Sequence, residues 1–257
     1  MNQYLRNLKR IEFVVTMNCT GKCKHCSQGM HNSNENIDKD IAADAVRKIA
    51  KEYHINSVMT FGGEPLLFPE TVYAIHNAVK EMNIPHRQLI TNGYFSRDIN
   101  KIESVAEMLS ECGVNDILLS VDAFHQETIP LEYVKIFAEN IIKNNLPIRV
   151  HPAWLVSEND DNVYNINTRE LLSEFTVMGI DLSEGNVIFP SGNALKFFAE
   201  YFDLNNNVKN PYEEDPTDIR AICFSANGNI LGSNVYKQDI NEILSFYNPQ
   251  GITMNTD

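Results

Sequence analysis

The sequence predicts an α/β protein built from six successive β/α units. Short apolar runs alternate with longer stretches of helical periodicity, which is the pattern of parallel strands joined by helices. Polar or glycine-rich residues follow each apolar run, and in β/α barrels such residues gather at the carboxyl ends of the strands. With 257 residues, 43% of them hydrophobic, the chain is long enough for one large domain with a full core.

The expected strands are short and apolar, and most of them end at a turn signal or a polar residue. The first is rich in β-branched residues, and the third ends in Asn92-Gly93, a turn dipeptide. The fifth follows Pro147, and the sixth ends in Pro190-Ser191-Gly192. We expect strands at residues 11–17, 57–61, 87–91, 116–121, 148–156 and 186–189.

The expected helices show apolar residues at helical spacing together with end signals. Asp38 or Asp40 can cap the first helix, Pro69 suits the first turn of the second, and Gly113 marks the end of the third. Residues 160–167 are polar and are expected to form a loop. We expect helices at residues 37–53, 69–82, 100–112, 131–144 and 168–178.

The rhythm changes after residue 194, so we predict a core at residues 1–194 and a C-terminal extension at 195–257. An aromatic helical patch comes first, followed by an acidic surface loop at 205–216. Residues 221–225 and 230–232 flank Asn227-Gly228, which predicts a hairpin. A short helix at 240–246 completes the extension.

Composition excludes several functions. The formal net charge is −13 and the chain has no basic run, so we expect no binding to nucleic acid. The first ten residues lack the apolar segment of a signal peptide, and no stretch is long and apolar enough to span a membrane. Three of the five cysteines lie within eight residues, which favours a cytoplasmic metal site over a disulfide framework.

The three clustered cysteines, Cys19, Cys23 and Cys26, have the spacing C-x3-C-x2-C. Such a loop offers three thiolates and no fourth. A 4Fe–4S cluster held by three cysteines keeps one iron free for another ligand, whereas a structural zinc site normally has four protein ligands. A zinc site completed by His25 or His31 is the alternative.

The cysteine spacing at the end of the first strand, with Gly62-Gly63-Glu64-Pro65 at the end of the second, resembles the radical S-adenosylmethionine (radical SAM) enzymes. The match covers roughly residues 11–194. The resemblance implies an incomplete (β/α)6 TIM-like barrel with a short C-terminal extension. It also implies one 4Fe–4S cluster held by the three cysteines, and S-adenosylmethionine bound through its amino and carboxylate groups to the open iron. One electron, expected from a flavodoxin- or ferredoxin-type donor, then cleaves the sulfonium to a 5′-deoxyadenosyl radical that abstracts hydrogen from the substrate.

The same resemblance suggests which residues bind the cofactor. Gly62 and Gly63 would let the backbone approach the methionine moiety, and Glu64 would supply a carboxylate near its amino group. The further candidates follow strands three to six, and they are Asn92, Ser120, Asp122, Arg149, His151 and Ser191. Ser120 and Asp122 can instead cap a helix, and Arg149 and His151 can instead pair within the barrel. His125, just after strand four, is a candidate catalytic residue or a loop residue.

Two departures from the family pattern stand out. His25 occupies the position before the third cysteine, where the family usually has an aromatic residue. Around Cys223 the sequence resembles the start of the cysteine-rich extension of peptide-modifying members, but no further cysteine follows. Cys112 and Cys223 cannot supply an auxiliary cluster, so we expect a degenerate extension without iron. Both are expected to be buried as small apolar residues.

The substrate prediction follows from the implied architecture. An incomplete barrel has a lateral opening that suits a large substrate, and the remnant of the extension points the same way. The first hypothesis is therefore hydrogen abstraction from a peptide or protein side chain during peptide maturation. A small-molecule substrate is the first alternative, and a non-catalytic iron–sulfur or zinc protein is the second.

Overall fold

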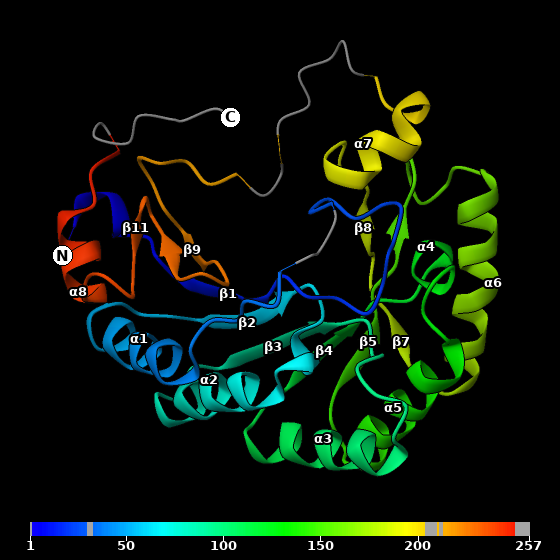
Figure 1. Ribbon diagram of the computed structural model, residues 1–257, viewed down its shortest axis with the longest axis horizontal. Coiled ribbons are helices and arrows are strands. Elements are labelled where there is room, and N and C mark those ends of the chain that lie inside the picture. The colour runs from blue at the N-terminus through cyan, green and yellow to red at the C-terminus, as the bar shows by residue number, and fades with distance from the viewer. Residues whose placement is uncertain (1, 30–32, 204–209, 211–212, 250–257) are drawn as a thin grey trace.

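A computed structural model describes residues 2–29, 33–203, 210 and 213–249. Seven parallel strands form one sheet in the order β7-β5-β4-β3-β2-β1-β9. Figure 1 shows this sheet curving, with helices along its outer side. The strands are β1 Arg10–Thr16, β2 Ser57–Gly62, β3 His86–Thr91, β4 Asp116–Leu119, β5 Ile148–Val150, β7 Asp181–Leu182 and β9 Ala221–Phe224. The predicted α/β class is confirmed, and the arrangement is that of a partial barrel.

The helices cover the sheet because one face of each is apolar. In α1, for example, Ala42, Ala45, Val46 and Ile49 are buried, and the Asp38 side chain caps the first turn as predicted. The α-helices are α1 Lys39–Glu52, α2 Pro69–Glu81, α3 Ile99–Glu111, α4 Ala123–Gln126, α5 Leu131–Lys143, α6 Val163–Val177, α7 Gly192–Phe198 and α8 Ile240–Phe246. The 3-10 turns are η1 Gln3–Leu5, η2 Pro65–Leu67 and η3 Ala199–Tyr201. None of these helices combines the length and the apolar character that crossing a membrane requires.

The predicted fifth strand is two strands. After β5 the chain turns at Pro152, which has no N–H to donate, and β6 (Ala153–Trp154) pairs with β8 (Asn186–Val187) instead of joining the main sheet. The N–H of Ala153 bonds to the Asp122 carboxylate at 3.0 Å. The short β7, which the sequence did not predict, takes the place beside β5 in the main sheet.

Helix α6 begins five residues before its predicted start. The side chain of Asn162 caps it by accepting a hydrogen bond from the Asn165 N–H at 3.0 Å. Asn165 is itself buried, and its amide bonds to the carbonyl oxygens of Leu155 and Ser157. Polar side chains here satisfy buried backbone groups, so a polar stretch that indicated a loop forms the first turn of a helix.

The C-terminal segment adds a strand to the main sheet. β9 pairs in parallel with β1, with Arg10 opposite Ala221 and Phe13 opposite Phe224. The predicted hairpin is therefore wrong in its first strand, because the hairpin consists of β10 (Asn229–Ile230) and β11 (Ser233–Asn234). The helix predicted at 240–246 is confirmed as α8. The predicted acidic loop at 205–216 lies mostly outside the described residues.

Candidate cluster and cofactor site

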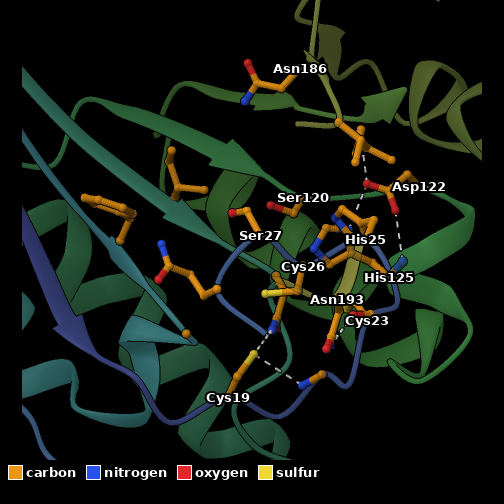
Figure 2. Close-up of a pocket in the computed structure, with 18 of the residues that line it drawn as sticks. Cys19, Cys23, His25, Cys26, Ser27, Ser120, Asp122, His125, Asn186 and Asn193 are labelled. Carbon is orange, nitrogen blue, oxygen red and sulfur yellow. Dashed lines mark hydrogen bonds and ion pairs between the residues drawn. The ribbon is translucent and has the colours of Figure 1, made fainter. Parts of the chain in front are cut away.

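A cavity of about 570 Å³ opens at the carboxyl ends of the strands. Residues 17–29, called the cysteine loop below, form one wall, and the ends of β2, β3 and β4 with residues 186–197 form the others. Figure 2 shows the cysteines below and Asn186 on the opposite side. The sequence-predicted site residues that line the cavity are Cys19, Cys23, Cys26, Gly62, Gly63, Asn92, Ser120, Asp122, His125 and His151. Glu64, Arg149 and Ser191 do not border it.

The three cysteines of the cysteine loop form no disulfide and are largely shielded from solvent. Burial raises the pKa of Cys19 to about 12, and the Glu64 carboxylate adds to the rise. Burial also raises the pKa of Cys23, with Asp122 adding to it, and the pKa of Cys26. Because iron binds thiolates, assembly of a cluster here must release the thiol protons, and the metal charge has to compensate for their loss.

Helix α7 lies against the cysteine loop and holds it through hydrogen bonds. The Asn193 N–H bonds to the Cys26 carbonyl at 2.9 Å, and the Asn193 side chain reaches the Cys23 carbonyl at 3.2 Å. Gly192 has a φ of +53°, and a Cβ there would meet the Ser27 carbonyl oxygen at 2.4 Å. The turn at 190–193, which contains the predicted cofactor residue Ser191, thus binds the loop itself. The hydroxyl of Ser191 likewise donates to the Ser27 carbonyl at 3.2 Å.

The two glycines after β2 allow a close contact between two backbone segments. A Cβ on Gly63 would stand 2.1 Å from the Asn18 carbonyl oxygen, and one on Gly62 would stand 2.5 Å from the Thr16 oxygen. The N–H groups of Gly63 and Glu64 bond to these same two oxygens at 2.8 Å. The glycines therefore dock the second strand end on the start of the cysteine loop, which is a different reason for glycine from the predicted approach to methionine.

Glu64 is completely buried, and its carboxylate is bonded to protein groups. It accepts hydrogen bonds from the Leu66 N–H at 2.9 Å, the Thr91 hydroxyl at 2.7 Å and the Asn92 N–H at 2.8 Å. Burial raises the pKa of Glu64 to about 7, although these hydrogen bonds oppose the rise. The carboxylate thus fixes the end of β3 through Thr91, which was not among the predicted site residues.

Asn92 and Ser120 lie where a ligand of the cavity can reach them. The Asn92 side chain donates to the Thr20 hydroxyl at 3.2 Å and approaches the Cys19 sulfur at 3.6 Å, so it orients the first cysteine. Ser120 follows β4 and lines the cavity, and Figure 2 shows its hydroxyl beside that of Ser27.

Arg149 lies on β5 and His151 directly follows it, but the two side chains make different contacts. Arg149 forms a bidentate ion pair with Asp116 at 2.8 to 2.9 Å, away from the cavity. This is the pairing within the barrel that the sequence left open as its alternative role. His151 lines the cavity, with its ring nitrogens 2.7 Å from the Ser183 hydroxyl and 2.8 Å from the Asn186 amide. Burial lowers the pKa of His151.

Asp122 and His125 form a pair at the cavity wall. The Asp122 carboxylate accepts the His125 backbone N–H at 2.9 Å and lies 2.8 Å from His125 Nδ1. Asp122 thus caps the four-residue helix α4, as the capping alternative predicted. The imidazole of His25 stands next to this pair, with its ring centroid 4.7 Å from that of His125.

The donor set fits a cluster with three protein ligands. Three thiols from one loop line a single cavity, whereas Cys112 lies at the end of α3 and Cys223 lies on β9. His25, which would complete a zinc site, has its ring against Phe124 and His125. The fold and the site thus define an α/β protein with a three-cysteine metal site at the carboxyl edge of a parallel sheet.

The chain belongs to the radical SAM superfamily, whose family model matches residues 13–149. Enzymes of this superfamily use a 4Fe–4S cluster and S-adenosylmethionine, as the resemblance predicted. Among curated proteins, the chain is similar to GTP 3′,8-cyclase of Clostridium perfringens, with 26% identity over 175 residues, 64% of this chain and 52% of the relative. A probable GTP 3′,8-cyclase of Methanocaldococcus jannaschii is 27% identical over 129 residues, 49% of this chain and 40% of the relative. The chain spans about half the length of these relatives.

Solved structures agree with the fold. The structure described as "Native anSMEcpe with bound AdoMet and Cp18Cys peptide" matches with a TM-score of 0.58 and 16% identity, over 90% of this chain and 75% of that one. The structure described as "Crystal structure of HydG: A maturase of the [FeFe]-hydrogenase" matches with a TM-score of 0.51 and 11% identity, over 74% and 45%. At these identities the likeness extends to the fold alone.

Proposed function

We propose that this chain is a radical SAM enzyme that acts on a peptide or protein side chain. The observation that carries the proposal is the set of three thiols facing one cavity at the carboxyl edge of the sheet. A cluster with one open iron, together with S-adenosylmethionine, supplies one-electron cleavage of the sulfonium and a radical that removes hydrogen from a substrate. The residues of the chain bind, orient and shield these groups.

Each part of the cavity wall has a task in this proposal. Cys19, Cys23 and Cys26 hold the cluster as thiolates. Asn92 orients Cys19, and Glu64 is a positioning residue that acts through Asn92. Around them, the residues proposed to bind S-adenosylmethionine line the cavity, namely Gly62, Gly63, Ser120 and His151.

The proposal of a peptide substrate rests on the size and the rim of the cavity. About 570 Å³ lies within the range of small-molecule sites, so a macromolecular substrate enters only in part, as a side chain does. Val187 and Phe197 border the cavity and are 53% and 43% exposed, which offers apolar contact to a chain lying across the opening. A flavodoxin- or ferredoxin-type protein is the proposed electron donor. The five cysteines all lie in the described part of the chain and form no disulfide there, which favours a reducing cytoplasm.

A small-molecule substrate is the second candidate, and the names of the curated relatives favour it. Those relatives are GTP 3′,8-cyclases, but they share only about a quarter of their residues with this chain over the matched region. Replacing Val187 or Phe197 by Ser separates the two candidates. The affinity for a peptide substrate should fall, because the peptide loses apolar contacts at the cavity opening. The affinity for a small molecule held inside the cavity should not change.

The enzyme proposal is tested with anaerobically reconstituted protein. We expect about four irons per chain and formation of 5′-deoxyadenosine from S-adenosylmethionine under a strong reductant. Cys23→Ser should abolish both, while Cys112→Ser, at the end of α3, should keep the cluster. Deuterium transfer from labelled candidate peptides and from labelled GTP into 5′-deoxyadenosine then identifies the substrate class.

Three results would overturn the proposal. An intact cluster that forms no 5′-deoxyadenosine would support a non-catalytic iron–sulfur protein. Electron paramagnetic resonance of the reduced cluster provides an independent readout, because a spectrum that does not change on adding S-adenosylmethionine would exclude an open iron that binds it. If the purified protein held zinc instead of iron at the three cysteines, the assignment of a 4Fe–4S cluster would be wrong.

A further inference from the structure

A second group of metal-ligating side chains lies beside the cysteine loop. It consists of His25, Asp122 and His125, called the His–Asp–His cluster below, whose donor atoms all lie within 4.8 Å of one another. The three residues come from the cysteine loop, the segment after β4 and helix α4. All three line the cavity, and Figure 2 shows them next to one another.

The carboxylate at the centre of this cluster is buried and charged. Asp122 has no exposed surface, and its oxygens accept hydrogen bonds from the N–H groups of His125 at 2.9 Å and Ala153 at 3.0 Å. Burial alone would raise the pKa of Asp122, but the imidazoles of His125 and His25 and the hydrogen bonds hold it well below its usual range. A buried anion of this kind needs a cationic partner.

His25 carries a buried nitrogen that has no partner. Its Nδ1 is shielded from solvent and makes no hydrogen bond. In a neutral imidazole, one of the two ring nitrogens carries a lone pair that can bind a metal ion. An unsatisfied buried polar atom indicates a missing water or ion. Helix capping by Asp122 explains the pairing with His125, but it does not explain the unpaired nitrogen of His25.

We propose that the His–Asp–His cluster binds one divalent transition metal ion, Zn²⁺ or Fe²⁺, separate from the cluster held by the three cysteines. Two imidazoles and one carboxylate are a donor set typical of these ions. The ion takes the place of the proton between Asp122 and His125 Nδ1, which is released, and it also binds the unpaired nitrogen of His25. The two backbone N–H groups remain on the carboxylate and orient it.

The spacing of the ligands requires little adjustment. Ligand atoms at about 2.1 Å from one ion stand at most about 4.2 Å apart. Since all the donor atoms lie within 4.8 Å of one another, no separation has to shorten by more than about 0.6 Å, which small side-chain rotations can provide. Three protein ligands leave coordination positions open toward the cavity. The ion would therefore bind an oxygen donor of a substrate, such as a hydroxyl or carboxylate.

Zinc is the probe that tests this site, because it can be counted separately from iron. The full-length protein is reconstituted with iron and sulfide, equilibrated with Zn²⁺ in slight excess without S-adenosylmethionine, and desalted before elemental analysis. We expect one zinc per chain with the iron content unchanged. His25→Phe and His125→Gln should each weaken zinc binding by more than about 100-fold, the upper end of the loss that outer-shell partners cause.

His151→Gln is the matched control, because His151 lines the same cavity but is bonded to Ser183 and Asn186. It should retain zinc. His25→Phe keeps a ring against Phe124 and decides the question if His125→Gln fails to fold, and circular dichroism with the iron content monitors folding. X-ray absorption at the zinc edge of the wild-type protein should show imidazole nitrogens and no sulfur.

Three outcomes would overturn the inference. These are wild-type protein that binds no zinc, zinc content unaffected by both histidine substitutions, and zinc that binds only as iron is lost or with sulfur ligands. The inference does not depend on the proposed enzyme function. Iron content and 5′-deoxyadenosine formation are measured on the same samples, so failure of the enzyme proposal and failure of the zinc site give different results.

Discussion

Replacing Gly63 by Ala should detach the cysteine loop from the barrel with little effect elsewhere. An alanine Cβ would stand 2.1 Å from the Asn18 carbonyl oxygen, while real Cβ contacts essentially never fall under 3.0 Å. The two backbones must therefore separate by about 0.9 Å, the difference between these distances. The atom it meets belongs to backbone, so no side-chain rotation relieves the clash. The segment that moves begins one residue before Cys19.

We expect Gly63→Ala to be destabilised by about 1–3 kcal/mol, as overpacked variants are. Its iron content after reconstitution should fall far below that of the wild type, and a displacement near 1 Å should reduce formation of 5′-deoxyadenosine by about 100-fold. Gly179→Ala is the control. Gly179 has a φ of +78° with nothing within 4 Å of a Cβ, so the change adds backbone strain of about 1–2 kcal/mol without touching the loop. If the two variants lose stability equally and both keep full iron, the docking role of Gly63 is wrong.

Three further substitutions test the supports of the site and the core. Burial lowers the pKa of His76 to about 3, so below about pH 6.5 the unfolded chain binds a proton that the folded chain does not. The free energy of unfolding should therefore fall by about 1 kcal/mol per pH unit in this range. In thermal unfolding at a series of acid pH values, the stability of His76→Gln should depend less on pH than that of the wild type. Glu64→Gln places an amide N–H₂ against at least one of the three N–H or O–H donors that now bond to the carboxylate. Chemical denaturation should therefore show a free energy of unfolding lower by about 1–3 kcal/mol, and the Asn92 amide signal should shift in the nuclear magnetic resonance spectrum. Asn193→Ala removes the side-chain bond to the Cys23 carbonyl, worth about 1 kcal/mol, and should accelerate iron loss to a chelator about fivefold; an unchanged rate would contradict the role assigned to α7.

The local patterns of the sequence predict the strands and the cysteine loop, because hydrophobic periodicity and ligand spacing are properties of neighbouring residues. The predicted strand at 57–61 corresponds to β2, and the helix at 69–82 corresponds to α2. Contacts between distant segments could not be predicted in this way. The pairing of β9 with β1 and the bonds from Asn193 to the cysteine loop join residues that are more than 160 positions apart. No local signal distinguishes a strand that joins a distant neighbour from one that forms a hairpin.

In the candidate site, likewise, the sequence predicts which residues matter but not which contacts they make. The sequence predicted Glu64 as a functional residue from its motif. The three groups bonded to it come from η2, the end of β3 and the residue after β3, and only the fold brings them together. From the sequence, His25 was noted as a departure from the family pattern and as a possible fourth ligand of a zinc site. Its unpaired nitrogen becomes informative because the fold places it beside Asp122 and His125, a hundred residues away.

The placement of β9 gives the C-terminal segment a structural role that does not need iron. Phe224 on β9 stacks on Phe13 of β1 with ring centroids 4.6 Å apart, and both side chains are fully buried. β1 leads directly into the cysteine loop, so a strand that covers its outer edge also fixes the position from which the loop departs. Burial of two aromatic rings contributes several kcal/mol, more than one surface hydrogen bond provides. The further cysteines of an auxiliary cluster can therefore be missing from this segment without loss of its contribution to the site, because that contribution is made by the packing of β9 against β1.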